Sequence, residues 1–160
     1  MPEVVCNTSP LQYLHQTDML RVLPTLYGRV LVPQAVADEI GVGLKAGVNL
    51  PDLSELDWLD VRIVENSPWP VPRDIHRGEA EVMALAGTLG DARVILDDLA
   101  ARRHAKLLGL KCTGTLGIIL KAKQAGILDS VAEVVGELER LGFRLAWVTK
   151  QEILKLAGED

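Results

Sequence analysis

Short apolar runs alternate with helical segments along the whole chain. The runs that read as strands are residues 3–6, 29–32, 61–64, 92–96 and 110–112. Successive strands joined through a helix pair in parallel, and the crossover between them is right-handed. The alternation therefore predicts a three-layer α/β/α fold around a short, mostly parallel central sheet of four or five strands.

Length and composition indicate one domain with an aliphatic core. The chain has 160 residues, of which 48% are hydrophobic and only 4% aromatic, so we expect a single compact domain over residues 1–160. No apolar run approaches the roughly 18 residues that span a bilayer, and no basic segment precedes an apolar one at the start. Cys6 and Cys112 supply neither a disulfide framework nor a zinc site. These features predict a soluble cytoplasmic protein with no membrane association.

The charge is unevenly distributed. A formal net charge of −5 argues against a generally basic nucleic-acid-binding domain. Between Leu99 and Leu128, however, there is no acidic residue, and all six charged residues are basic: Arg102, Arg103, Lys106, Lys111, Lys121 and Lys123. This stretch is either a local basic surface or the ordinary solvated face of two helices.

Polar side chains follow several of the predicted strands. Asn7 comes directly after the first strand, and Asp97 and Asp98 come directly after the fourth. Glu39 lies on the helix after the second strand, and Glu79 lies in the first turn of the helix that begins near residue 78. Because the carboxyl ends of parallel strands meet at one edge of a sheet, we expect these side chains to converge there. Converging carboxylates need a cation, and hard oxygen ligands select Mg²⁺ or Mn²⁺.

Each of these residues also has a purely structural interpretation. Glu79 would complement the dipole of its helix, and Asp97 or Asp98 would cap the helix that follows. After Asn7, the pair Ser9 and Pro10 predicts a helix with Ser9 as its N-cap. A nucleotide-binding regulator is a further alternative, but the chain has no glycine-rich phosphate loop of the expected form.

Five motifs occur in a characteristic order and spacing. They are NTSPL at 7–11, VPQAVADEI at 32–40, RGEAEVMALA at 77–86, VILDDLAAR at 94–102 and GTLGIIL at 114–120. Through these motifs, nearly the whole chain resembles the PIN-domain nucleases. It is most similar to a prokaryotic PIN subfamily of largely unassigned function that is related to the VapC-type toxins.

The resemblance implies a metal-dependent endoribonuclease, and it relates the chain to the toxins of toxin–antitoxin pairs. It places the catalytic and Mg²⁺- or Mn²⁺-binding positions on Asn7, Glu39, Glu79, Asp97 and Asp98, with Glu81 as a weaker candidate. It also implies supporting roles for Thr8, Ser9 and Thr115, and RNA contacts from Arg102 and Arg103. The implied partners are RNA, an antitoxin protein and a second copy of the chain, for which Leu11, Leu14 and Leu20 offer an apolar surface.

The chain departs from the family pattern at Asn7, where the family has aspartate. Asparagine keeps one carbonyl oxygen, but it lacks the charge that attracts a divalent cation or supports a general base. Three interpretations follow: a working nuclease with weaker metal affinity, an inactive PIN-like module that binds RNA or protein, or an engineered substitution. The sequence leaves all three open.

Overall fold

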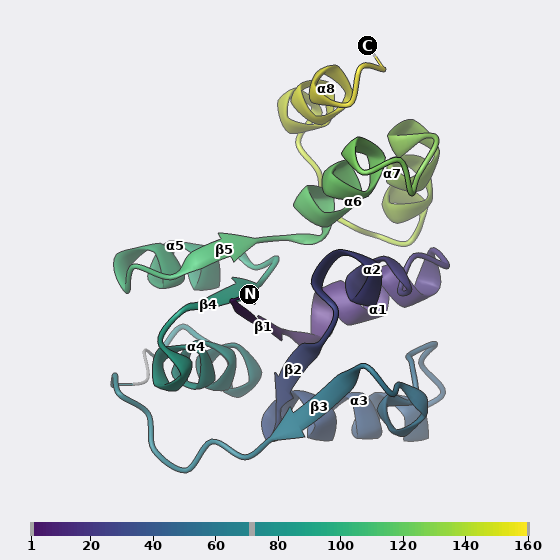
Figure 1. The fold of residues 1–160 in the computed structure, drawn as a ribbon. Coiled ribbons are helices and arrows are strands. Elements are labelled where there is room, and N and C mark those ends of the chain that lie inside the picture. Colours follow the sequence, from purple (N-terminus) through teal and green to yellow (C-terminus); the bar gives the residue numbers. More distant parts are fainter. Residues whose placement is uncertain (1, 71–72, 160) are drawn as a thin grey trace.

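The structure, a computed structural model, describes residues 2–70 and 73–159. Its centre is a parallel five-stranded sheet with the strand order β3-β2-β1-β4-β5 (Figure 1). The strands are β1 (Glu3–Cys6), β2 (Val30–Pro33), β3 (Leu59–Arg62), β4 (Ala92–Ile95) and β5 (Lys111–Thr113). The predicted α/β fold and parallel sheet are confirmed.

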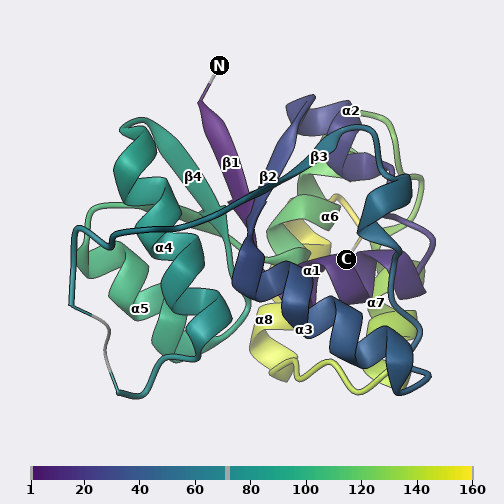
Figure 2. The same ribbon diagram turned by 90° about the horizontal axis from the view of Figure 1, so that it is seen from below.

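Helices cover both faces of the sheet. Helices α4 and α5 lie on one side of the sheet, while α1, α2, α3 and α6 lie on the other, with α7 and α8 beyond α6 (Figures 1 and 2). Helix α3 packs against β2, β3 and α1, and it also meets α4. Their bounds are α1 (Thr8–Gln16), α2 (Val22–Tyr27), α3 (Gln34–Lys45), α4 (Arg77–Leu89), α5 (Leu99–Leu107), α6 (Thr115–Gln124), α7 (Val131–Arg140) and α8 (Trp147–Leu156), with a short 3₁₀ helix η1 (Leu53–Glu55).

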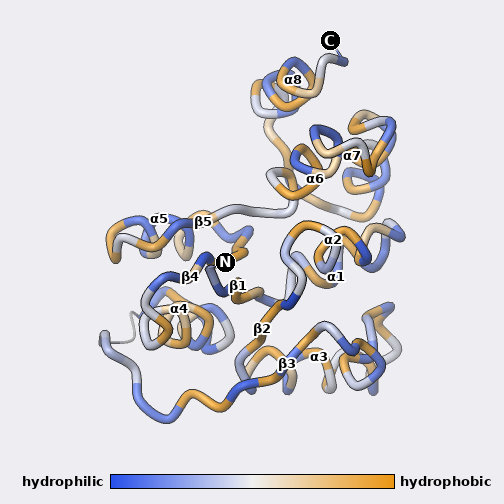
Figure 3. The backbone as a smooth tube through the Cα atoms, viewed as in Figure 1, coloured by the Kyte–Doolittle hydropathy of each residue, from blue (hydrophilic) through white to orange (hydrophobic). Residues whose placement is uncertain are grey.

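The core consists of aliphatic side chains from the central strands and the inner helix faces. Val5, Leu31 and Val94 lie on adjacent strands and are fully buried. Strands β1 and β2 are hydrophobic along most of their length (Figure 3), as expected for parallel strands covered on both faces. In the described part of the chain, no helix is long and apolar enough to cross a membrane.

Helix α1 begins earlier than the sequence indicates. Its N-cap is Asn7, not Ser9, and Pro10 is its third residue. The N–H of Asn7 still belongs to the sheet, since it donates to the Ile95 carbonyl oxygen at 3.1 Å. The chain therefore enters the helix directly from the strand, and Pro10 is tolerated because N–H groups of a first turn have no partner within the helix.

The apolar residues proposed for a dimer surface mostly belong to the core. Leu11 and Leu14 are fully buried on the inner side of α1, and Leu20 is half-buried. The expectation that Leu11 and Leu14 form a surface is wrong, because α1 packs this side against α3 and α6. A homodimer stays a prediction, but these two side chains cannot form its contact surface.

Candidate functional site

The candidate site lies where the order of the strands reverses. Strands β1 and β4 are neighbours in the centre of the sheet, with Cys6 paired to Ile95, and the chain continues from them toward opposite edges. In an open parallel sheet, the carboxyl ends of two such strands border a crevice that favours ligands. Asn7 follows one strand end, and Asp97 and Asp98 follow the other.

Glu39 approaches this edge from α3. The Thr8 hydroxyl donates to Oε2 of Glu39 at 2.6 Å, which links the start of α1 to α3. Gly78 lies in the first turn of α4, and a Cβ atom there would collide with Oε1 of Glu39. Glycine at position 78 therefore lets α4 begin directly against the Glu39 carboxylate. The motif RGEAE alone does not indicate this role, although its glycine in a first helical turn is the signal for a close approach.

Glu79 is buried beside Glu39 in the first turn of α4. Its Oε1 accepts a hydrogen bond from the His76 N–H at 3.3 Å. Burial raises the pKa of Glu79, and the negative charges of Asp98 and Glu39 raise it further, against the lowering effect of His76. The charges of Asp98, at the start of α5, and of Glu39, on α3, therefore both act on Glu79.

Two buried oxygens at this edge have no hydrogen-bond donor among the described residues, Oδ1 of Asn7 and Oε2 of Glu79. Asn7 is only 7% exposed, and although it is the N-cap of α1, its side chain accepts no capping bond. A buried acceptor without a donor is uncommon in proteins and is satisfied by an ordered water or an ion. An oxygen-liganded divalent cation fits these two oxygens.

The carboxylates do not form a compact group in this conformation. Across residues 2–70 and 73–159, no three aspartate, glutamate, histidine or cysteine side chains lie close enough together to hold a metal ion by themselves. The amide oxygen of Asn7 would have to complete the ligand set. The arrangement therefore fits a cation that is held weakly, or one that draws the carboxylates together when it binds.

The adjacent residues Asp97 and Asp98 have different partners. Both oxygens of Asp97 are occupied by Thr115, whose N–H and hydroxyl donate at 2.8 and 2.6 Å. Asp98 caps α5 by accepting from the Ala101 N–H at 3.0 Å, and its charge acts on Glu79. Asp98 therefore belongs to the acidic group, whereas Asp97 fixes the start of α6, and the N–H of Thr115 is not available for a phosphate.

Arg102 and Gly114 complete the surroundings of Asp97. Burial raises the pKa of Asp97, while the Thr115 hydrogen bonds and the charge of Arg102 lower it. Arg102 points inward, and its Nη1 donates to the Leu96 carbonyl oxygen at 3.1 Å. A Cβ atom at Gly114 would lie 2.6 Å from Nη1 of Arg102 and 2.8 Å from Oδ1 of Asp97. The first glycine of GTLG is thus required for this contact, and the motif itself carries the signal for it.

The remaining candidates lie around the group. Glu81 accepts from the Ala35 N–H and from Nε of Arg77, both at 3.1 Å, so it links α4 to α3 and its oxygens are engaged. Ser9 is half-buried in the first turn of α1, and Arg103 is exposed on α5.

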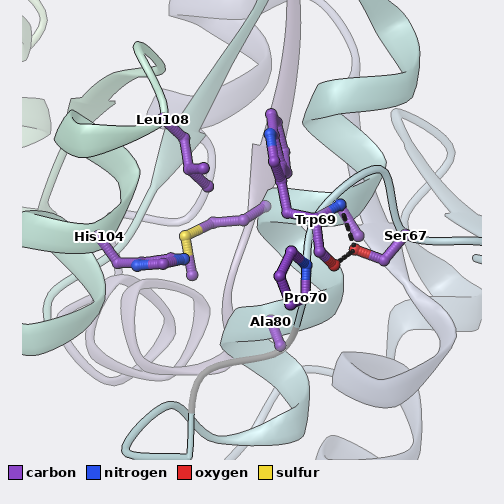
Figure 4. A pocket seen from close by; sticks show the side chains of 8 residues that line it. Ser67, Trp69, Pro70, Ala80, His104 and Leu108 are labelled. Carbon is purple, nitrogen blue, oxygen red and sulfur yellow. Dashed lines mark hydrogen bonds between the residues drawn. The ribbon is translucent and has the colours of Figure 1, made fainter.

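A separate small pocket lies away from these acids, between the proline-rich loop and helices α4 and α5 (Figure 4). Trp69 and Ala80 line one side of it, and His104 and Leu108 line the other. The Ser67 hydroxyl donates to the Trp69 carbonyl oxygen at 2.6 Å and fixes the loop. With a volume of about 10 Å³, the pocket has space for about one water molecule, so it is not a substrate site.

The fold and this edge define a parallel α/β protein with acidic side chains gathered at the strand-order reversal. The DUF3368 family of PIN domains matches residues 3–159, and the chain therefore belongs to the PIN-domain family, a nuclease-type family.

The fold is also similar to that of a PilT N-terminus domain protein, SSO1118, from the hyperthermophilic archaeon Sulfolobus solfataricus. The TM-score is 0.53 at 19% sequence identity, over 72% of this chain and 88% of that chain. No curated protein matches the chain.

Proposed function

We propose that the protein is a Mg²⁺- or Mn²⁺-dependent endoribonuclease whose affinity for the cation is lowered by asparagine at position 7. The observation that carries this proposal is the pair of buried oxygens without donors on Asn7 and Glu79, beside the carboxylates of Glu39 and Asp98. Membership of the PIN-domain family supports nuclease chemistry, and the choice of RNA as substrate rests on the resemblance of the motifs.

Four residues would hold the cation: Asn7 through its amide oxygen, and Glu39, Glu79 and Asp98 through carboxylates. A divalent cation bound there supplies Lewis-acid stabilisation of a phosphodiester and lowers the pKa of a coordinated water. The chain itself positions the ligands. Thr8 fixes the Glu39 carboxylate through its hydroxyl, and the Asp97–Thr115 pair sets the start of α6 against the end of β4.

The proposal is tested by titrating Mn²⁺ into the protein and into Asn7→Asp by calorimetry. A 5′-labelled single-stranded RNA is incubated with the same samples. Restoring a charged ligand is expected to tighten Mn²⁺ binding at least about tenfold, or 1.4 kcal/mol, and both proteins are expected to cut. Glu152→Gln, which removes an exposed carboxylate on α8, should behave as the unmodified chain. Absence of Mn²⁺ binding and of cleavage in both proteins would contradict the proposal.

A second candidate function is a non-catalytic module that binds RNA or protein. The uncharged Asn7 and the lack of a compact acidic group among the described residues favour it. In that case Asn7→Asp does not create cleavage, and RNA binding persists in EDTA. A toxin role, an antitoxin partner and a homodimer stay predictions from the resemblance.

A further inference from the structure

Helix α5 has an exposed face that begins at the candidate site. Asp98 is the N-cap of this helix, and Ala101 and Ala105 are fully buried on its inner side. The outer face of α5, defined here as Leu99, Arg103, Lys106 and Leu107, points to solvent. Leu99 is 67% exposed and Leu107 is 84% exposed, so this face presents two large apolar side chains together with its two cations.

The cations of this face have no acidic partner. Among residues 2–70 and 73–159, neither Arg103 nor Lys106 makes an ion pair. In contrast, other basic side chains of the stretch are engaged: Lys121 donates to the Tyr27 hydroxyl at 3.3 Å, and Lys123 pairs with Glu159 at 3.3 Å. Lys111 is also exposed and makes no ion pair among these residues, but it lies on β5. On α5, Arg103 and Lys106 form a small cationic surface on the helix that Asp98 caps.

The spacing along the helix suits a strand of nucleic acid. At 1.5 Å per residue, Arg103 lies about 7 Å and Lys106 about 12 Å beyond Asp98 along the axis, or about one and two nucleotides of an extended strand. Leu99, Arg103 and Lys106 share one side because they are separated by four and three residues. Leu99 precedes the two cations and Leu107 follows them. These apolar side chains at either end of the cationic pair can contact bases, which are accessible in single strands and hidden in duplexes.

From this we infer that the outer face of α5 binds the substrate strand of the proposed ribonuclease, so the inference rests on that function. Arg103 and Lys106 contact consecutive phosphates on one side of the scissile phosphate, and Leu99 and Leu107 contact unstacked bases. The inference commits to single-stranded RNA as the ligand. Arg102, which the sequence placed with Arg103, does not take part because it faces the Leu96 carbonyl oxygen.

The test measures binding without cleavage. Fluorescence anisotropy of a short 5′-labelled single-stranded RNA is followed in EDTA over a series of salt concentrations, for the unmodified protein and for Arg103→Ala/Lys106→Ala. Loss of two phosphate contacts should weaken binding about tenfold or more at low salt. It should also reduce the slope of log K against log salt by about 1.4. Lys155→Ala is the matched control, since Lys155 is also an exposed lysine in the last turn of a helix.

A second variant, Leu99→Ser/Leu107→Ser, separates base contacts from charge. It should weaken binding of the single strand and leave the salt slope unchanged. Its thermal unfolding should match that of the unmodified protein because both side chains are exposed. Three results would each overturn the inference: the Arg103/Lys106 variant binds RNA as tightly as the unmodified protein, Lys155→Ala loses as much binding as that variant, or the unmodified protein does not bind RNA.

Failure of the proposed function gives a different result. If RNA binding maps to α5 but no cation supports cleavage, α5 is an RNA-binding surface and the nuclease assignment fails. If the unmodified protein and the Arg103/Lys106 variant cleave RNA equally well, the nuclease assignment holds and the inference fails.

Discussion

Single side chains determine how the acidic edge behaves without a cation. Oε2 of Glu79 is buried and has no hydrogen-bond donor among the described residues, and the charges of Asp98 and Glu39 oppose ionisation of this carboxyl group. Leaving a buried acceptor unpaired costs about 1–3 kcal/mol. Folded proteins retain an unpaired buried group mainly where that group has a function. The edge is therefore expected to be a place where stability and function conflict.

Removal of this charge should stabilise the cation-free protein. Glu79→Gln keeps the acceptor for the His76 N–H but carries no charge to desolvate or repel. Its thermal midpoint in EDTA at neutral pH should rise by about 2–4 °C, the change that roughly 1 kcal/mol gives in a chain of this length. Calorimetry should show that the same variant loses Mn²⁺ binding. A lower midpoint would mean that the carboxylate is compensated by a partner after all.

We expect Asp97 to contribute to the stability of the fold and Asp98 to act as a ligand of the cation. Asp97→Asn replaces an acceptor of one of its two Thr115 bonds with a donor, and we expect a loss of about 1–2 kcal/mol in urea unfolding with Mn²⁺ binding retained. Asp98→Asn keeps a good N-cap for α5, so stability should change little while Mn²⁺ affinity falls about tenfold or more. The opposite pattern would make Asp97 the ligand.

At the scale of the elements, the C-terminal helix is held at its end. Helix α8 contains no fully buried residue. Just beyond it, the Glu159 carboxylate accepts from the Val131 N–H at 2.8 Å and from the Ala132 N–H at 3.1 Å, in the first turn of α7. These bonds, and then Lys123, lower the pKa of Glu159. The carboxylate joins α8 to α6 and α7.

This attachment should weaken in acid. Because the folded-state pKa of Glu159 is lowered, its contribution to stability is complete above the ordinary glutamate pKa and is lost as the pH falls through the folded-state value. In Glu159→Gln, amide hydrogen exchange in α8 should be faster at neutral pH, while the sheet keeps its protection. The difference from the unmodified protein should shrink at acidic pH. A difference that stayed constant with pH would assign the effect to packing.

The elements show which parts of the structure follow from the sequence. Strand β2 is apolar and buried along its whole length, so its position was predicted within one residue. Helix α8 begins at Trp147, but Trp147 and Val148 are 73% and 61% exposed, so the sequence shows no burial pattern from which this start could be predicted. Apolar residues recur at helical spacing where a helix buries one face, and no residue of α8 is fully buried.

The candidate site was predictable in its location but not in its details. Topology alone brings the ends of β1 and β4 together, so the approach of Asn7 to the aspartate pair follows from the strand order. The division of labour between Asp97 and Asp98 could not be predicted, because it depends on where α6 starts in space. The role of Gly78 depends likewise on how closely α4 approaches Glu39.

At the scale of the whole molecule, a cation at this edge would join side chains from four helices. Its ligands come from the starts of α1, α4 and α5 and from the middle of α3. A ligand that binds the folded state and not the unfolded state stabilises the fold, by about 2.7 kcal/mol at a hundred times its dissociation constant. Metal binding should therefore be measurable as global stability, independently of any cleavage.

When the thermal midpoints of the unmodified protein and of Asn7→Asp are plotted against Mn²⁺ concentration, the two curves should cross. Without a cation, the added carboxylate repels Glu79 and Asp98, and Asn7→Asp should unfold at a lower temperature than the unmodified protein. As Mn²⁺ is added, the variant should gain more stability and overtake it, because a fourth charged ligand raises affinity only in the folded state. Thermal unfolding monitored by circular dichroism over a Mn²⁺ series locates the crossing. Parallel curves that never cross would show that position 7 does not contact the cation, whatever the other carboxylates bind.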